Sequence, residues 1–318
     1  MLSGKHLEKR YPWKRWVHSS GAISAVRNVS LRIRAGETIG LVGESGSGKS
    51  TLGRCLAGLE KPSAGSVFYG DLEIYSLSRR EARFMRRRIQ YIHQDPVDAL
   101  NPYRTIGQSI AEPLWYFGVK NHADRRAAAA RLLEMVELPT TYLDKYPLEL
   151  SRGQCQRVNI ARALIVEPEI IICDEVISAL DVSTGVQILQ LLKELQQQNG
   201  YGYLFISHDL SRVIQISDWI AVMYMGEIVE FAPAENFHET ALHPYAQVLI
   251  EAVPRLIPGE SIEALSSSTF ETPQSQLTDV EGCPFHPRCP LATKRCREQK
   301  PVLRAVGAHR VMCHFVEP

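Results

Sequence analysis

The amino-acid sequence predicts an α/β protein with a mixed sheet, an inserted helical subdomain and a small Cys-rich extension at its C-terminus. Three observations predict this fold class. Strand-like and helix-like segments alternate along most of the chain, as they do around sheets with parallel strands. Residues 105–165 read as mainly helical between two groups of strands. Four of the seven cysteines lie after residue 282, namely Cys283, Cys289, Cys296 and Cys313.

The composition is that of an ordinary globular chain. Hydrophobic residues make up 45% of the 318 residues and charged ones 22%, which excludes collagen-like and wholly disordered classes. The 36 Lys and Arg are balanced by 35 Asp and Glu. This balance argues against a nucleic-acid partner, because proteins that grip such backbones carry a basic excess. No apolar run reaches the ~18 residues that span a bilayer, and the basic N-terminus lacks the apolar core of a secretory signal. We therefore expect a cytosolic chain.

The first predicted elements surround a glycine-rich loop. Apolar and polar residues alternate over 29–34, which indicates a strand with one solvated face. Residues 38–42 are mainly apolar, as in a strand covered on both faces. The loop 43–50 and a helix over 50–58 follow. Six arginines between 79 and 88 predict a solvated face before a strand over 89–92, since the run lacks the set of aromatic residues that base stacking needs.

The later part of the chain supplies the remaining strands. Strands are predicted at Ile170–Cys173 and Tyr203–Ile206. The helix between them is marked by apolar residues at helical spacing, which are Ile188, Leu191, Leu192 and Leu195. Trp219–Tyr224 and Glu227–Phe231 predict a hairpin that turns at Met225-Gly226.

Composition divides the chain into three parts. We expect the α/β domain at 1–250, with its helical subdomain at about 95–168, where residues 127–135 are rich in Ala and Leu. Residues 251–282 hold six acids against one base and include three consecutive serines, which is typical of a linker. Residues 283–318 then form the Cys-rich extension.

The segment 43–50 fits the phosphate-binding pattern Gly-x-x-x-x-Gly-Lys-Ser. Its glycines let backbone N–H groups point at phosphate oxygens, beside the positive N-terminus of a helix. Lys49 is expected to reach the β- and γ-phosphates, and the Ser50 hydroxyl to ligate Mg²⁺. The pattern predicts that nucleotide is bound by Gly43, Ser45, Gly46, Gly48, Lys49, Ser50 and Thr51.

A phosphate loop needs carboxylates on a neighbouring strand. The predicted strand 170–173 ends in Asp174 and Glu175, and ligands of α/β sheets bind at the carboxyl ends of strands. Asp174 is expected to hold Mg²⁺, directly or through water. Glu175 is expected to orient and deprotonate the attacking water, a role worth about 10²–10⁴-fold in rate.

Six features, taken together and in this order, resemble the ATP-binding cassette superfamily. They are the phosphate loop, Gln94 after strand 89–92, Leu150–Gln154, the pair 174–175, Ser178–Asp181, and His208 after Phe205-Ile206-Ser207. A lone Gln or His is uninformative, whereas the set is specific. The resemblance implies a P-loop ATP-binding cassette that hydrolyses ATP.

The resemblance also implies how the remaining residues act. Two cassettes pack head to tail, so that Ser151, Gly153 and Gln154 of one subunit contact the γ-phosphate on the other, and Asp181 lies at the seam between them. Within one subunit, His208 contacts the γ-phosphate, while Gln94 senses Mg²⁺ or water and reports to a membrane partner.

An aromatic residue near the N-terminus would stack on adenine in such cassettes. Tyr11, in Lys9-Arg10-Tyr11-Pro12, is the first choice, with Trp13 and Trp16 as alternatives.

Two positions depart from the family pattern. Arg152 stands where the signature usually has Gly, and Val176-Ile177 replaces Pro-Thr after the acid pair. Because Arg152 places a cation where the backbone approaches the triphosphate, it can either attract the phosphates or spoil the fit. We expect a functional ATPase with unequal sites.

The C-terminal extension resembles that of oligopeptide and dipeptide importer ATPases, a group that includes nickel and some oligosaccharide transporters. It carries His243-Pro244-Tyr245 and then cysteines spaced C-x₅-C-x₆-C-x₁₆-C. Disulfides are disfavoured in a reducing cytosol. Zinc suits four thiolates but usually takes paired short spacings. The resemblance implies a [4Fe–4S] cluster on Cys283, Cys289, Cys296 and Cys313, with zinc as the alternative. His286, His309 and His314 could substitute as ligands, but we expect them to be surface residues.

The sequence distance of these cysteines from Lys49 and Glu175 predicts a structural or redox-sensing role. Replacing Cys289 by Ser is therefore expected to leave nucleotide binding intact.

We therefore expect the ATP-hydrolysing subunit of an importer for di- or oligopeptides, at the cytoplasmic face of the cell membrane. Its cofactors would be ATP, Mg²⁺ and the cluster. Its partners would be a second homologous ATPase subunit, more readily in a heterodimer than a homodimer, two transmembrane permease subunits and an extracytoplasmic solute-binding protein. The alternatives are an importer of nickel or oligosaccharides and a soluble cassette ATPase.

Overall fold

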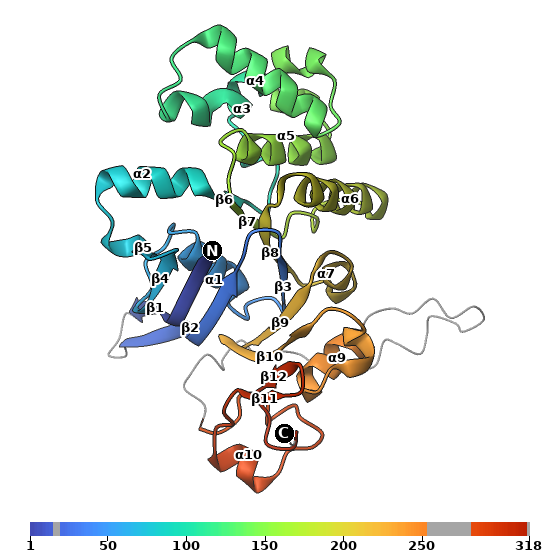
Figure 1. The fold of residues 1–318 in the computed structure, drawn as a ribbon. Helices are drawn as coiled ribbons and strands as arrows, with labels where there is room; N and C mark the ends of the chain where they lie inside the picture. The colour runs from blue at the N-terminus through green and yellow to red at the C-terminus, as the bar shows by residue number, and fades with distance from the viewer. Residues whose placement is uncertain (15–19, 253–280, 317–318) are drawn as a thin grey trace, which may run out of the picture.

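The structure, a computed structural model, describes residues 1–14, 20–252 and 281–316 and contains two sheets (Figure 1). The smaller sheet is antiparallel, in the order β2-β1-β4-β5. Its long strands are β1 (Leu2–Lys14) and β2 (Ser20–Ile33), and its short ones are β4 (Ala64–Tyr69) and β5 (Leu72–Glu73). The sequence predicted only the second half of β2. The register of β1 against β2 shifts between Gly4 and Arg10, which interrupts the two-residue periodicity.

The larger sheet is mixed, as predicted. Its order is β11-β12-β10-β9-β3-β8-β7-β6. Five strands are parallel: β3 (Thr38–Val42), β6 (Ile89–Ile92), β7 (Ile170–Asp174), β8 (Gly202–Ser207) and β9 (Trp219–Tyr224). Three continue the edge antiparallel: β10 (Glu227–Pro233), β11 (Arg304–Val306) and β12 (His309–Val311).

Both faces of the parallel strands are buried, which explains their continuous apolar sequence. On one face, Leu204 and Ile206 of β8 pack with α1 (Lys49–Leu56) and the smaller sheet. On the other face, Tyr203 and Phe205 pack with α5 (Arg152–Leu164), α6 (Val182–Asn199) and α7 (Leu210–Ile216). The carboxyl ends of β3, β7 and β8 therefore lie side by side at one edge of the sheet.

The helical segment between β6 and β7 lies at one end of the molecule (Figure 1). It contains α3 (Ile106–Tyr116), α4 (His122–Met135), two 3-10 turns, η2 (Thr140–Asp144) and η3 (Pro147–Glu149), and α5. Thr105 with Gln108 and Ser151 with Gln154 form capping boxes that begin α3 and α5. These reciprocal hydrogen bonds satisfy the free N–H groups of each first turn.

The solvated face predicted for residues 79–88 is the helix α2 (Arg79–Arg88), which follows the short η1 (Ile74–Ser76). Several of its arginines bind acceptors within the chain. Arg88 pairs with Glu169 and Arg87 with Glu167.

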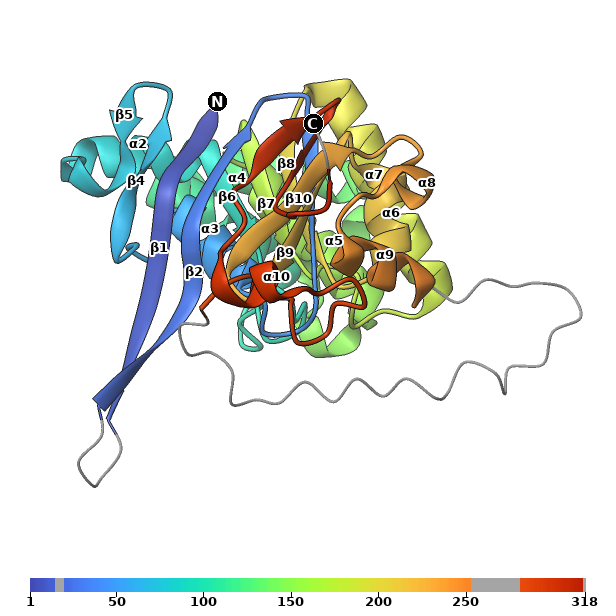
Figure 2. The same cartoon turned by 90° about the horizontal axis from the view of Figure 1, so that it is seen from below.

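The chain after β10 packs back onto the larger sheet. It contains α8 (Phe237–Thr240), α9 (Pro244–Glu251) and α10 (Lys294–Glu298). The strand β12 pairs with β10, Glu230 opposite Val311. The extension lies below the hairpin β9–β10 in Figure 1 and in front of it in Figure 2, which is seen from below. Phe285 and Met312 are buried in the same core as the parallel strands. Most of the predicted linker lies outside the described residues, and no described helix is long and apolar enough to cross a membrane.

Candidate functional site

The phosphate loop joins the end of β3 to α1, and its backbone requires glycine at residue 48. Gly48 has a φ of +103°, and a Cβ there would lie 2.0 Å from the carbonyl oxygen of Ala25. Lys49, 5% exposed, turns back into the loop. Its Nζ donates to the carbonyl oxygens of Gly43 at 2.7 Å and Glu44 at 2.8 Å. The loop thus holds a buried ammonium group where the sequence pattern predicts the phosphates.

Charges around Lys49 act against the cost of its burial. Burial lowers the pKa of the ammonium group, whereas the carboxylates of Glu175, Asp174 and Glu44 raise it. Two of these acids are the predicted pair at the end of β7, so the structure brings the loop and the acid pair together. The other predicted loop residues are placed unequally: Thr51 is buried, while Ser45 and Gly46 are exposed.

Asp174 and Ser50 form an oxygen site beside the loop. The Ser50 hydroxyl donates to Asp174 Oδ1 at 2.9 Å, and Asp174 is 5% exposed. Carboxylate and hydroxyl oxygens are hard ligands that suit Mg²⁺, which usually takes one or two protein ligands besides phosphate and water. These two residues therefore fit the predicted metal.

Tyr91, which sequence reasoning missed, holds the second oxygen of Asp174. Its hydroxyl donates to Oδ2 at 2.6 Å. Burial first, and then the Asp174 carboxylate, raise the pKa of this phenol above its ordinary value. Tyr91 precedes Gln94 in sequence, but only the pairing of β6 with β7 brings it to Asp174.

Glu175 and His208 meet at the ends of β7 and β8. Glu175 Oε2 lies 2.9 Å from His208 Nδ1, and their side chains are 14% and 58% exposed. Glu175 has a φ of +52°, and its N–H donates to Ile206 O at 3.0 Å. Left-handed backbone at a residue other than glycine costs of order 1 kcal/mol and is concentrated at functional sites. The conformation turns the chain immediately after Asp174.

Val176 and Ile177, which depart from the family pattern, are 2% and 1% exposed and belong to the core. Gln94 is exposed in the segment after β6. Because Ile92 pairs with Cys173, this segment leaves the sheet beside the acid pair.

Tyr11 is half-buried on β1 and lies near the end of the phosphate-loop helix, where it interacts with Arg54 and Glu60. Lys9 Nζ lies 5.2 Å from the centre of its ring. The pKa of the nearby Glu60 carboxyl is lowered: burial opposes the shift, and hydrogen bonds from Tyr11, Lys9 and Arg54 outweigh it. The side chain of Trp13 and all of Trp16 lie outside the described residues.

The segment 151–154 begins α5. The Ser151 hydroxyl accepts from the Gln154 N–H at 3.3 Å, and the Gln154 amide oxygen accepts from the Ser151 N–H at 2.9 Å. A Cβ on Gly153 would lie 2.5 Å from Thr184 Cγ2, so α5 and α6 approach closely here. Arg152 is exposed at the first position of α5.

Asp181 caps α6. Its carboxylate accepts from the Ser183 hydroxyl at 2.6 Å and from the N–H and hydroxyl of Thr184 at 2.9 and 2.7 Å. The hydrogen bond from Ser183, followed by those from Thr184, holds the pKa of Asp181 well below its usual range. No hydrogen bond between described residues joins residues 151–154 or Asp181 to the phosphate loop of the same chain.

The Cys-rich extension contacts the phosphate loop, although the two segments are far apart in the sequence. Arg288 binds both carboxylate oxygens of Glu44, at 2.8 and 2.7 Å. The Tyr245 hydroxyl accepts from the Glu44 N–H at 2.9 Å. Both contacts span more than 200 residues, and no local sequence signal indicates them.

The four cysteines of the extension line one small cavity together with His243 and Phe285. Burial raises the pKa of the Cys283 thiol to about 11 and also raises that of Cys289. Among the described residues, no group of three or more His, Cys, Asp or Glu side chains is arranged to hold a metal ion. The predicted cluster is therefore not supported by these positions.

The three histidines of the extension that could serve as substitute ligands contact other groups. Ring nitrogens of the three histidines lie within hydrogen-bond distance of acceptors in the chain: His286 of Cys283 O, His309 of Glu230, and His314 of Gln299 O.

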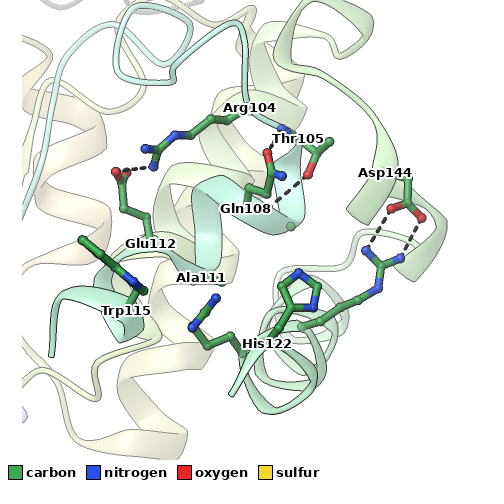
Figure 3. Close-up of a pocket in the computed structure, with 11 residues that line it drawn as sticks. Arg104, Thr105, Gln108, Ala111, Glu112, Trp115, His122 and Asp144 are labelled. Atoms are coloured by element: carbon green, nitrogen blue, oxygen red, sulfur yellow. Dashed lines mark hydrogen bonds and ion pairs between the residues drawn. The ribbon is translucent and has the colours of Figure 1, made fainter. Parts of the chain in front are cut away.

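A cavity of about 440 Å³ lies on the helical segment and shares no residue with the phosphate loop. Figure 3 shows Arg104 paired with Glu112 on one side of it, and Trp115 and His122 across from Thr105 and Gln108. Trp115 is 65% exposed. This cavity belongs to a surface separate from the site described above.

Comparisons with known proteins agree with this geometry. The family model described as ABC transporter matches residues 26–178, and that described as oligopeptide/dipeptide transporter, C-terminal region, matches residues 229–296. A protein of Brucella abortus (strain 2308), named for peptide import and ATP binding, is 46% identical over 92% of this chain and 87% of its own. The di/tripeptide transport ATP-binding protein DppF of Pseudomonas aeruginosa is 38% identical over 100% of this chain and 98% of its own.

Among solved structures, a dimeric ATP-binding cassette in a post-hydrolysis state, bound to ADP and Pi, matches with a TM-score of 0.66. It is 33% identical and covers 74% of this chain and 99% of its own. The chain thus has the phosphate loop, the acid pair and the extension, and it is related to these proteins along nearly its whole length. It belongs to the ABC transporter family as an ATP-binding protein with the oligopeptide/dipeptide transporter C-terminal region.

Proposed function

We propose that the chain hydrolyses ATP to drive an importer of di- or oligopeptides. One observation carries the proposal: the carboxyl ends of β3, β7 and β8 bring Lys49, the Ser50–Asp174 pair and the Glu175–His208 pair to one site. The C-terminal region and the relatives' names support peptides as the solute. Nickel or oligosaccharides remain the alternative solutes of the same machinery.

Each residue of this site has its own role in binding or hydrolysing ATP. Lys49 and the loop N–H groups bind the β- and γ-phosphates, while Tyr11 stacks on adenine. Ser50 and Asp174 would hold Mg²⁺, with Gln94 beside them, and the ion would neutralise developing charge on the phosphates. Glu175 accepts a proton from the water whose oxygen bonds to the γ-phosphorus. The bond from that phosphorus to the β–γ bridging oxygen breaks, which yields ADP and phosphate. His208 binds the γ-phosphate and orients Glu175.

A second ATPase subunit completes each site. Ser151, Gly153 and Gln154 lie at the start of α5, and none of the hydrogen bonds found within the described part of the chain joins them to its own phosphate loop. We therefore assign them to a partner's γ-phosphate, with Asp181 at the seam. The dimeric cassette among the solved relatives supports this arrangement. We favour a heterodimer, in which Arg152 makes the two sites unequal. Unchanged turnover in an Arg152→Gly assembly would contradict that inequality.

The transported solute crosses through two permease subunits, supplied by an extracytoplasmic solute-binding protein, while this chain lies peripherally at the cytoplasmic face of the membrane. The cavity of Figure 3 is where we place the permease contact, because its exposed Trp115 lies in the helical segment that follows Gln94. Trp115→Ala is expected to weaken copurification with the permeases. Leu291→Ala, also exposed but on the extension, is the matched control.

For the extension we retain the four-cysteine cluster as a proposal. The four thiols share one cavity, which supports a common ligand. Four thiolates suit either a [4Fe–4S] cluster or zinc, but zinc sites usually take paired short spacings that this chain lacks, so zinc is the alternative. Protein purified without oxygen should contain about four irons per chain. A content of one zinc and no iron would overturn the cluster. Protein that contains neither metal would rule out the metal site altogether.

Equilibrium binding and hydrolysis of MgATP test the main proposal. The intact chain should bind MgATP, and the assembled transporter should couple hydrolysis to peptide uptake. Lys49→Ala removes the buried cation of the loop and should weaken triphosphate binding at least tenfold, since charge-assisted contacts to phosphate are among the stronger hydrogen bonds. Equal affinity in parent and variant would contradict the assignment of the loop.

A further inference from the structure

Arg288 links the Cys-rich extension to the phosphate loop. Its Nη1 donates to Glu44 Oε2 at 2.8 Å and its Nη2 to Oε1 at 2.7 Å. The side chains of Arg288 and Glu44 are only 16% and 28% exposed. A bidentate guanidinium–carboxylate pair fixes orientation as well as charge, and partial burial protects this one from solvent screening. The pair therefore restrains a residue inside the phosphate loop.

Aromatic packing holds Arg288 in place. Phe285 is 2% exposed, and its ring centre lies 5.3 Å from that of Tyr224 and 5.4 Å from that of Tyr245. The Arg288 guanidinium lies 5.8 Å from the ring centres of Tyr224 and Phe285. Tyr245 also accepts the Glu44 N–H, so both the side chain and the backbone of Glu44 are held from this side.

Glu44 affects the phosphate site through its charge and its backbone. Its carbonyl oxygen accepts from Lys49 Nζ at 2.8 Å, and its carboxylate is one of the acids that favour the charged form of Lys49. Arg288 neutralises this carboxylate. Without Arg288, an uncompensated negative charge would remain in a loop that must receive a triphosphate. Two like charges ~8 Å apart at an effective dielectric constant of ~20 repel strongly enough to change an affinity about thirtyfold, before screening by salt.

We propose that Arg288 is a positioning residue for the phosphate loop, through which the Cys-rich extension sets the affinity of the chain for MgATP. The proposal rests on the proposed function in ATP binding and adds to it a residue outside the cassette motifs. It also reverses the sequence-based expectation that Cys289→Ser leaves nucleotide binding intact, because Cys289 adjoins Arg288 and lines the same cavity as Phe285.

The test measures the dissociation constant of MgATP for the full chain and its variants at one salt concentration. Arg288→Met should weaken binding about tenfold, and Arg288→Lys, which keeps the charge but not the bidentate geometry, should weaken it less. Adding Glu44→Gln to Arg288→Met should restore most of the affinity, since it removes the uncompensated carboxylate. The double-mutant cycle isolates this coupling from other effects of each change.

Lys300→Met is the matched control. Lys300 also joins the extension to the cassette through an ion pair, but with Glu227 at the start of β10. This variant should bind MgATP as the parent does. Thermal unfolding without nucleotide shows whether each variant is folded.

A reciprocal experiment tests the same coupling without measuring a dissociation constant. If the extension strengthens MgATP binding, MgATP must stabilise the extension by the same factor. Hydrogen exchange over residues 283–290 should therefore slow on adding MgATP in the parent and not in Arg288→Met.

The outcomes separate two failures. A parent chain that does not bind MgATP would overturn the proposed function. A parent that binds, with Arg288→Met equal to it or with a loss that Glu44→Gln does not relieve, would overturn the role of Arg288 alone.

Discussion

Single residues at the ends of β7 and β8 are those to which we assign the hydrolytic chemistry. Glu175 has a left-handed φ of +52°, and its side chain contacts His208. The residue before it, Asp174, accepts a hydrogen bond from Ser50. Two adjacent carboxylates thus contact different partners, one beside the proposed metal position and the other beside a histidine. This arrangement is consistent with the roles proposed for the two acids, cation binding for Asp174 and proton acceptance for Glu175.

At this scale we predict that Glu175→Gln keeps MgATP binding and lowers turnover by about 10²–10⁴-fold, because the amide preserves shape but cannot accept a proton. Binding is measured on the purified chain and turnover on the assembled transporter. Glu149→Gln, a change of the same kind on the helical segment, is the control. Turnover equal to that of the parent would show that Glu175 is not the base.

At the scale of elements, the contact between α5 and α6 determines where the segment 151–154 lies. Ser151 and Asp181 cap the two helices, and Gly153 lets them approach so closely that a Cβ would lie 2.5 Å from Thr184 Cγ2. Thr184 cannot easily rotate away, because it is β-branched and its hydroxyl donates to Asp181 at 2.7 Å. The glycine that the resemblance assigns to a partner's nucleotide therefore also has a packing role within the chain.

We predict that Gly153→Ala destabilises the folded chain by about 1–3 kcal/mol, as overpacking does, although alanine is the better helix former by ~1 kcal/mol. Thr184→Ser removes Cγ2 and keeps the hydroxyl that bonds to Asp181. In that background the stability change caused by Gly153→Ala should have the opposite sign, so that alanine at 153 stabilises the folded chain. Denaturant unfolding of the four proteins in this cycle measures the effect. Equal destabilisation by Gly153→Ala in both backgrounds would contradict the steric explanation.

At the scale of the whole molecule, the extension and the cassette form one packed unit. β12 continues the larger sheet beyond β10, Phe285 is buried in the same core as the parallel strands, and Arg288 reaches the loop at the far end of β3. The helical segment lies at the opposite end (Figure 1). This arrangement leaves the N-terminus of α5 available to a second subunit.

We predict that the Glu175→Gln chain, mixed with its homologous ATPase partner and MgATP, forms a stable two-subunit assembly, because nucleotide bound between two subunits favours their association until it is hydrolysed. Light scattering measures the mass. The same mixture with Lys49→Ala in this chain should form less of the assembly. Full dimerisation of this chain with itself under the same conditions would contradict the preference for a heterodimer.

Much of the site follows from the sequence because its signals are local. The phosphate loop has fixed spacing around residue 48, where only glycine suits the left-handed φ and the close approach of Ala25. The strands β3, β6 and β9 match their predicted bounds, because strands buried on both faces carry continuous apolar sequence. Carboxylates that end such a strand lie at the ligand edge of any α/β sheet. The resemblance to the ATP-binding cassette superfamily rests on the same local motifs.

Only the tertiary structure decides which distant side chains meet. Tyr91 reaches Asp174, His208 reaches Glu175, and Arg288 reaches Glu44 across 244 residues. These contacts depend on strand order and on the packing of the extension against the hairpin β9–β10, and neither leaves a periodic or spaced pattern in the chain. The sequence motifs gave no sign that the extension contacts the loop, whereas the fold places Arg288 beside Glu44. The physical reason is that a motif encodes local backbone geometry, while a long-range ion pair is determined by the order in which strands join the sheet.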